Sequence, residues 1–126
     1  MQAIHSTLAP SAIGPYSQAI SCQGFIFISG QIPLNPQTMT LISDDIEEQT
    51  EQVFANISAV CDAAHGSLAD IVKLTIYLTD LKHFDLVNSV MEKYFTAPFP
   101  ARATLQVSAL PKGAAIEIDA IMTLRN

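Results

Sequence analysis

Residues 100–107 read Pro-Ala-Arg-Ala-Thr-Leu-Gln-Val, and residues 116–119 read Ile-Glu-Ile-Asp after a Leu-Pro-Lys-Gly turn at 110–113. Apolar and polar side chains alternate along both segments, which predicts the last two strands of the fold, over 103–109 and 115–124. The first segment places Arg102, and the second places Glu117, among apolar neighbours. Burying either ion unpaired would cost several kcal/mol, so each is expected to meet a partner, a ligand or water.

The chemistry of these two residues indicates a small-molecule site. The Arg102 fork suits a carboxylate, and a nearby Glu117 suits water and an amine. The alternation places Thr104 on the predicted face that carries Arg102. The pattern also fits a sheet with one wet side, where Arg102 and Glu117 are solvated or form a structural ion pair. The turn at 110–113 suggests a hairpin but does not decide whether the two strands pair directly.

The rest of the chain predicts four more strands and two helices. Short strands are expected over 2–5, 16–21 and 25–29, followed by a proline-containing loop over 31–40. An apolar stripe at helical spacing predicts a helix that is capped by Asp44 with Glu47 and stops at Gly66. A strand over 71–79 and a helix over 83–95 follow. The order β-β-β-α-β-α-β-β predicts an α+β fold with the helices on one face of a sheet.

The composition indicates one self-associating domain over residues 1–126. Hydrophobic residues make up 49% of the chain and charged residues only 14%, against roughly a quarter in an average soluble domain. No charged residue precedes Asp44. A small monomer with so few charges would expose large apolar patches. We therefore expect another subunit to cover the open face of the sheet.

Charge and spacing disfavour several classes of function. The net charge of -6 lacks a basic stripe and repels nucleic-acid backbones. The three histidines lie far apart, and Cys22 and Cys61 have no metal or redox spacing, so no metal is expected. No dinucleotide or phosphate-cradling glycine motif occurs, so no cofactor is expected. Prolines and glycines interrupt the apolar first third, and a signal-peptide pattern is absent; we therefore expect a cytoplasmic protein without membrane contact.

Several ordered segments together resemble the RidA/YjgF family of imine and enamine deaminases, over nearly the whole chain. They begin with Ala-Ile-Gly-Pro-Tyr-Ser-Gln-Ala at 12–19 and Ile-Ser-Gly-Gln-Ile-Pro at 28–33. Ile-Val-Lys at 71–73, Asp-Leu at 80–81 and Val-Asn at 87–88 follow. The segment 100–118, with Arg102 and Glu117 fifteen positions apart, is the most specific of these matches.

The resemblance implies chorismate-mutase-like subunits in a homotrimer, with a mixed sheet in each subunit and three sheets packed into a central barrel. It implies three pockets between neighbouring subunits and no cofactor or metal. The implied activity is hydrolysis of 2-iminobutanoate and 2-iminopropanoate to 2-oxo acids and ammonia, which protects pyridoxal-phosphate enzymes. The alternative is a non-catalytic protein that binds small 2-oxo acids for regulation.

The resemblance also implies roles for individual residues. Arg102 would bind the substrate carboxylate, and Glu117 would position the attacking water. The remaining implied pocket residues are Tyr16, closing the pocket across the interface, Ser29, Gly30, Thr104 and Asn88. The chain departs from the family at two positions: Thr104 stands where the archetype commonly has Cys, and Met91 stands where many relatives have an aromatic residue. A thiol at position 104 is therefore not required for the chemistry.

Overall fold

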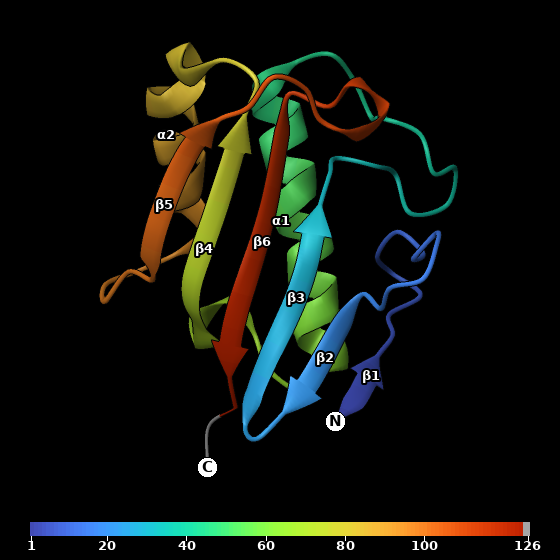
Figure 1. Cartoon of the computed structure of the whole chain (residues 1–126). Coiled ribbons are helices and arrows are strands. Elements are labelled where there is room, and N and C mark those ends of the chain that lie inside the picture. Colours follow the sequence, from blue (N-terminus) through green and yellow to red (C-terminus); the bar gives the residue numbers. More distant parts are fainter. Residues whose placement is uncertain (125–126) are drawn as a thin grey trace.

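A computed structural model describes residues 1–124 of the chain as one six-stranded mixed sheet with both helices packed on the same face (Figure 1). The sheet order is β1-β2-β3-β6-β4-β5, antiparallel except for the parallel pair β4 and β5. This confirms the predicted α+β class and element order. The strands are β1 (Gln2–Ile4), β2 (Ala19–Cys22), β3 (Phe25–Gln31), β4 (Ile71–Leu78), β5 (Ala101–Gln106) and β6 (Ile116–Thr123). The helices are α1 (Ile46–Ala63) and α2 (Phe84–Tyr94), with short 3-10 turns η1 (Leu68–Asp70), η2 (Leu81–His83) and η3 (Pro111–Gly113).

Two predicted strands and one suggested turn differ most from the structure. The second strand begins at Ala19 rather than at residue 16, because residues 12–17 form an irregular loop. The β5 strand covers 101–106 rather than 103–109. The turn at 110–113 does not close a hairpin, because β4 lies between β5 and β6. The connection from β4 through α2 returns the chain parallel to β4 and leaves β5 at the sheet edge.

The capping residues of α1 lie one position later than the sequence pattern predicts. Asp45, rather than Asp44, accepts a 2.9 Å hydrogen bond from the Glu48 backbone N–H. At the other end the helix stops at Ala63, and His65 adopts the left-handed conformation with a φ of 66°. The Gly66 N–H then bonds the Cys61 carbonyl, which closes the final turn of the helix.

The core lies between the helices and one face of the sheet. Leu74, Ile76 and Leu78 of β4 are fully buried there, because alternate strand residues point to the same face. Val53 and Phe54 of α1 are also fully buried. The other members of this core cluster include Ile57, Val60, Val87, Val90, Ile116, Ile118 and Met122. The apolar spacing of both helices therefore fixes which sheet face is covered and which is open.

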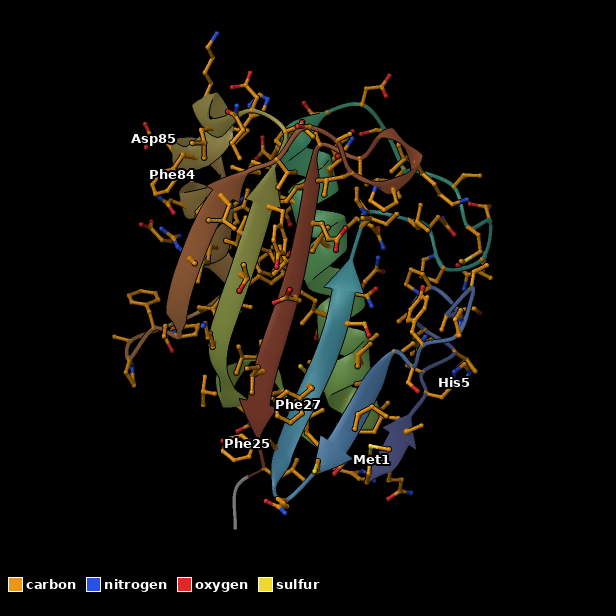
Figure 2. The ribbon with its side chains drawn as sticks, viewed as in Figure 1. Met1, His5, Phe25, Phe27, Phe84 and Asp85 are labelled. Atoms are coloured by element: carbon orange, nitrogen blue, oxygen red, sulfur yellow. The ribbon has the colours of Figure 1, made fainter. Side chains whose placement is uncertain are left out.

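The opposite sheet face carries exposed apolar side chains. Phe25 and Phe27 of β3 and Leu105 of β5 each remain nearly half exposed. Both phenylalanines lie on the side of the sheet away from α1 and α2 (Figure 2). Within residues 1–124 no helix combines the length and apolarity that crossing a bilayer requires.

Candidate functional site

The register of the three neighbouring strands separates Arg102 from Glu117. Leu74 of β4 lies opposite Arg102 of β5, so Arg102 shares the helix-covered face. Tyr77 of β4 lies opposite Glu117 of β6, and both residues belong to the open face. A single chain therefore places the guanidinium and the carboxylate on opposite sides of its sheet. The two side chains therefore do not meet within one chain.

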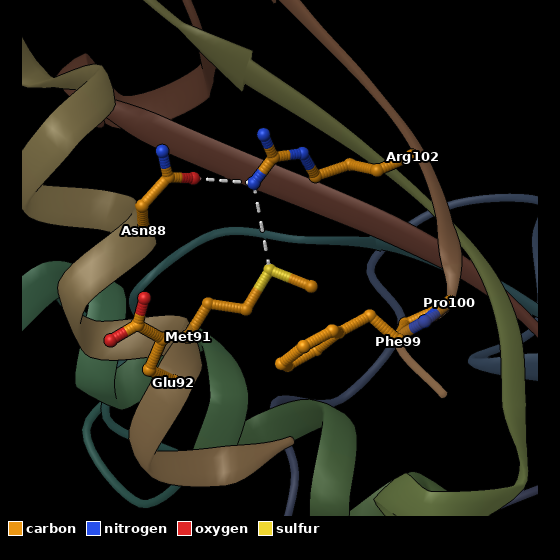
Figure 3. A pocket seen from close by; sticks show the side chains of 6 residues that line it. All are labelled: Asn88, Met91, Glu92, Phe99, Pro100 and Arg102. Atoms are coloured by element: carbon orange, nitrogen blue, oxygen red, sulfur yellow. Dashed lines mark hydrogen bonds between the residues drawn. The ribbon is translucent and has the colours of Figure 1, made fainter. Parts of the chain in front are cut away.

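Arg102 and α2 form the first half-site, which we call the arginine half-site (Figure 3). The Arg102 Nη1 donates a 2.5 Å hydrogen bond to Asn88 Oδ1 and lies 3.7 Å from Met91 Sδ. The guanidinium carbon is 5.2 Å from the centre of the Phe84 ring. The adjoining cavity has a volume of about 330 Å³ and is lined by Asn88, Met91, Glu92, Phe99, Pro100 and Arg102.

The charge of Arg102 is not neutralised by a carboxylate within residues 1–124. The ion pairs among these residues join Lys93 to Glu47 and Glu51, on the outer surface of the helices. Arg102 has five N–H donors, of which the contacts above engage only Nη1. A cation held in one orientation with unused donors is suited to a bidentate carboxylate ligand.

Glu117 anchors the second half-site, which we call the glutamate half-site. It lines a cavity of about 440 Å³ together with Tyr16, Gly30 and Lys112. Burial, and then the nearby Asp119 carboxylate, raises the pKa of Glu117 above its ordinary value. The other lining residues are Pro10, Ser11, Ile13, Gln18, Gln31, Ile32, Leu34, Met39 and Pro111.

Gly30 and Asp119 fix the surroundings of the Glu117 carboxylate. A Cβ at position 30 would lie 2.1 Å from Glu117 Oε2, so the close approach requires glycine. Asp119, two residues beyond Glu117 on the same face, accepts a 2.9 Å hydrogen bond from the Tyr77 hydroxyl. This bond raises the pKa of Tyr77, with burial adding to the effect. The carboxylate pair thus lies on one face of β6 beside a tyrosine donor.

The loop that carries Tyr16 is tied to the sheet. The Ser29 Oγ donates a 2.6 Å hydrogen bond to the Ser17 carbonyl, so the Ser29 hydroxyl supports this loop. Buried Gln18 accepts from the Ser6 N–H at 2.6 Å and donates to the Pro10 carbonyl at 2.8 Å. Tyr16 therefore belongs to the glutamate half-site of its own chain.

The structure places the sequence-predicted residues in two groups. Tyr16, Gly30 and Glu117 line one cavity, and Asn88 and Arg102 line the other. Thr104 lies two positions beyond Arg102 on the same strand, and its buried Oγ1 has no hydrogen-bond partner within residues 1–124. Ser29 does not line either cavity and supports the Tyr16 loop through its bond to the Ser17 carbonyl.

Sequence reasoning missed two residues. Phe84 contacts Arg102, and Gln18 holds the Tyr16 loop in place through its hydrogen bonds. The 84–88–91 spacing on one helix face was the available signal for Phe84. That spacing alone predicts core packing, because an apolar residue at helical spacing is most often buried. No local signal marks Gln18, since its partners lie 8 to 12 residues earlier.

Comparisons with known proteins define the class. Residues 6–124 match the model of the family described as Endoribonuclease L-PSP. Protein DfrA of Myxococcus xanthus is 52% identical over 122 residues, covering 95% of this chain and 93% of that protein. The human 2-iminobutanoate/2-iminopropanoate deaminase is 43% identical over 118 residues, covering 94% of this chain and 86% of that protein.

Solved structures agree in fold as well as in sequence. RidA from an Antarctic Psychrobacter superposes with a TM-score of 0.95 at 46% identity, covering 98% of this chain and 100% of that chain. Escherichia coli TdcF with bound serine gives a TM-score of 0.94 at 38% identity, covering 99% and 100% of the two chains. The chain belongs to the RidA/YjgF family.

Proposed function

We propose that this protein is a hydrolase that deaminates reactive 2-imino acids, with 2-iminobutanoate and 2-iminopropanoate as substrates, and so protects pyridoxal-phosphate enzymes. The observation that carries the proposal is the pair of incomplete half-sites. One offers an oriented Arg102 fork without a carboxylate partner among residues 1–124, and the other offers a half-buried Glu117 beside Gly30. Relatives of this chain carry the name of the proposed activity.

The proposed assembly is a homotrimer in which the open sheet faces pack around a central barrel. Phe25, Phe27 and Leu105 supply apolar surface that association would bury. The arginine half-site of one subunit would then meet the glutamate half-site of its neighbour. The free thiols of Cys22 and Cys61 accord with a reducing compartment such as the cytoplasm.

In the first step of the proposed reaction, Arg102 binds the substrate carboxylate through two charge-assisted hydrogen bonds. Two such bonds are worth about 3 kcal/mol or more when desolvated. Asn88 holds the guanidinium during this contact. The TdcF structure contains serine, which shares an α-carboxylate with the proposed substrates and therefore supports a carboxylate-binding site. Binding of the substrate carboxylate to Arg102 holds the imine carbon opposite the Glu117 side chain of the neighbouring subunit.

Glu117 then carries the proton transfers. Its ionised carboxylate stabilises the iminium form and orients a water onto the imine carbon. As the water oxygen bonds that carbon, Glu117 accepts a proton from the water and leaves a neutral carbinolamine. Glu117 returns this proton to the nitrogen, and the C–N bond breaks as the carbonyl forms. Glu117 accepts the hydroxyl proton in this step and passes it to the departing ammonia, so the 2-oxo acid and ammonium leave and the carboxylate is regenerated. General acid–base assistance of this kind typically contributes about a hundred- to ten-thousandfold.

Main-chain groups near Gly30 and Thr104 would hold the carbinolamine, and Tyr16 would cover the substrate. The raised pKa of Glu117 suits both the acceptance of a proton from water and its return to the nitrogen. A carboxyl group whose pKa lies closer to neutral pH gives its proton back more readily. The buried Thr104 hydroxyl lacks a partner within residues 1–124, so it can accept or donate one bond to substrate.

The test is ammonia release from an imine that threonine dehydratase generates in a coupled assay. Wild type is expected to accelerate this release, and Glu117→Ala is expected to abolish the acceleration. A second candidate, a non-catalytic binder of small 2-oxo acids, uses the same Arg102 fork. It predicts that wild type binds 2-oxobutanoate and gives no acceleration, a result that would overturn the enzyme proposal.

A further inference from the structure

The Arg102 guanidinium is contacted by three side chains that lie on one face of α2. Phe84, Asn88 and Met91 occupy positions i, i+4 and i+7, which share a helix face. Phe84 offers its ring to the guanidinium carbon at 5.2 Å, and Asn88 and Met91 offer an oxygen and a sulfur to Nη1. The cation is thus held by an aromatic face and two acceptors that carry no charge.

This arrangement differs from the common way of fixing an arginine, which is a carboxylate partner. A carboxylate would occupy the fork and cancel the charge that an anionic ligand needs. An aromatic face and an amide oxygen orient the guanidinium while leaving its net charge and most of its donors available. Glu92 lines the same cavity, but it forms no ion pair with Arg102 within residues 1–124.

We propose that Phe84 and Met91 are positioning residues that, with Asn88, hold the Arg102 fork in the orientation that receives a carboxylate. The catalytic consequence rests on the function proposed above. Arg102 lies on β5, the edge strand, and the adjacent residues Ala101 and Ala103 are exposed. A long side chain there would lose much rotamer freedom on binding a ligand, and the contacts with α2 reduce this loss in advance.

The burial of Met91 and Phe84 supports different contributions from these two residues. Met91 is only 6% exposed, and its sulfur lies 3.7 Å from the guanidinium Nη1. Phe84 is 37% exposed, far more than a residue that serves only core packing. Its position on the outer part of α2 is visible in Figure 2, at the same sheet edge as β5. The ring therefore contributes more through its contact with Arg102 than through burial in the core.

The test compares Phe84→Leu with Phe84→Tyr. Leucine keeps apolar bulk and removes the aromatic face, whereas tyrosine keeps the face. We expect Phe84→Leu to raise the Kd for 2-oxobutanoate and the KM for 2-iminobutanoate about two- to fivefold, the scale of a partly solvated cation–π contact. The kcat should stay within twofold of wild type, and Phe84→Tyr should restore both constants. Ser89→Ala, at an exposed position of α2 that is outside the arginine half-site, is the control for a change on this helix and should leave them unchanged.

A spectroscopic measurement separates the failure of this proposal from the failure of the proposed function. The ring current of Phe84 should shift the Arg102 Nε–H signal in a proton–nitrogen NMR spectrum. Phe84→Leu should remove this shift, and Phe84→Tyr should retain it. An unshifted signal, or a shifted signal with an unchanged Kd, overturns the positioning role. Wild type that binds no 2-oxo acid overturns the proposed function, and the NMR signal alone then decides whether the ring orients Arg102.

Discussion

Replacing Gly30 with alanine tests the geometry around Glu117 most sharply. A Cβ at this position would lie 2.1 Å from Glu117 Oε2 and 2.9 Å from its Cδ. The carboxylate oxygen must therefore retreat by about 1.3 Å to reach an ordinary 3.4 Å contact. The φ angle of Gly30 is outside the left-handed region, so the backbone accepts alanine and the clash is the whole perturbation.

The displacement predicts two separate effects of Gly30→Ala. Misplacing a catalytic group by about 1 Å costs roughly a hundredfold in rate, so kcat for imine hydrolysis should fall by about that factor. The free energy of unfolding should fall by no more than about 1 kcal/mol, because the atoms that must move are the end of a side chain that lines a cavity. Imine hydrolysis in the coupled assay and urea unfolding measure these effects on the same samples.

Two further variants make the Gly30 prediction specific. Gly30→Ala combined with Glu117→Ala removes the clash, so stability should recover while activity stays absent. Gly24→Ala strains a left-handed turn with a φ of 82° but meets no atom within 4 Å. It should lower stability by about 1–2 kcal/mol and keep kcat. A Gly30→Ala protein with kcat within threefold of wild type would refute the account of the Glu117 environment.

Three other predictions follow from the same contacts. Arg102→Lys should lower kcat/KM about ten- to a hundredfold, because an ammonium cannot form the bidentate fork; near-native turnover in the coupled assay would contradict the carboxylate grip. Asp119→Asn should move the acidic limb of the kcat/KM–pH profile to lower pH, because removing the Asp119 charge lowers the Glu117 pKa while its burial remains; an unmoved or raised limb would show that Asp119 does not act on Glu117. Asp45→Ala should lower the free energy of unfolding by about 1 kcal/mol in urea, because it removes the α1 cap, whereas Asp44→Ala should change it by less than about 0.5 kcal/mol; equal losses would place the cap wrongly.

The sequence predicts the elements of this fold well because their patterns are local. The 3.6-residue stripe of α1 and the alternation in β4 each fix a buried face, and the structure buries those faces. The position of β5 is different, because nothing within residues 100–113 encodes which strand lies beside it. The turn at 110–113 has the residues of a hairpin, yet packing through α2 inserts β4 between β5 and β6.

The site follows the same division between local and long-range information. The charges of Arg102 and Glu117 stand out because each interrupts an apolar strand. The relation between them depends on strand order, and the register with β4 puts them on opposite faces. Contacts such as Phe84 with Arg102 join positions 18 residues apart in sequence, and the sequence shows only the helical spacing of one partner.

The central claim is that each site takes Arg102 from one subunit and Glu117 from its neighbour, and mixed assemblies test it most directly. Arg102→Ala and Glu117→Ala chains, each inactive alone, are coexpressed in equal amounts with different tags, which show that mixed trimers form. All trimers, mixed and unmixed, are then assayed together. In a randomly mixed trimer with shared sites, every mixed assembly regains one intact site, so the total activity should reach about a quarter of wild type. Mixtures as inactive as the separate variants would contradict the claim.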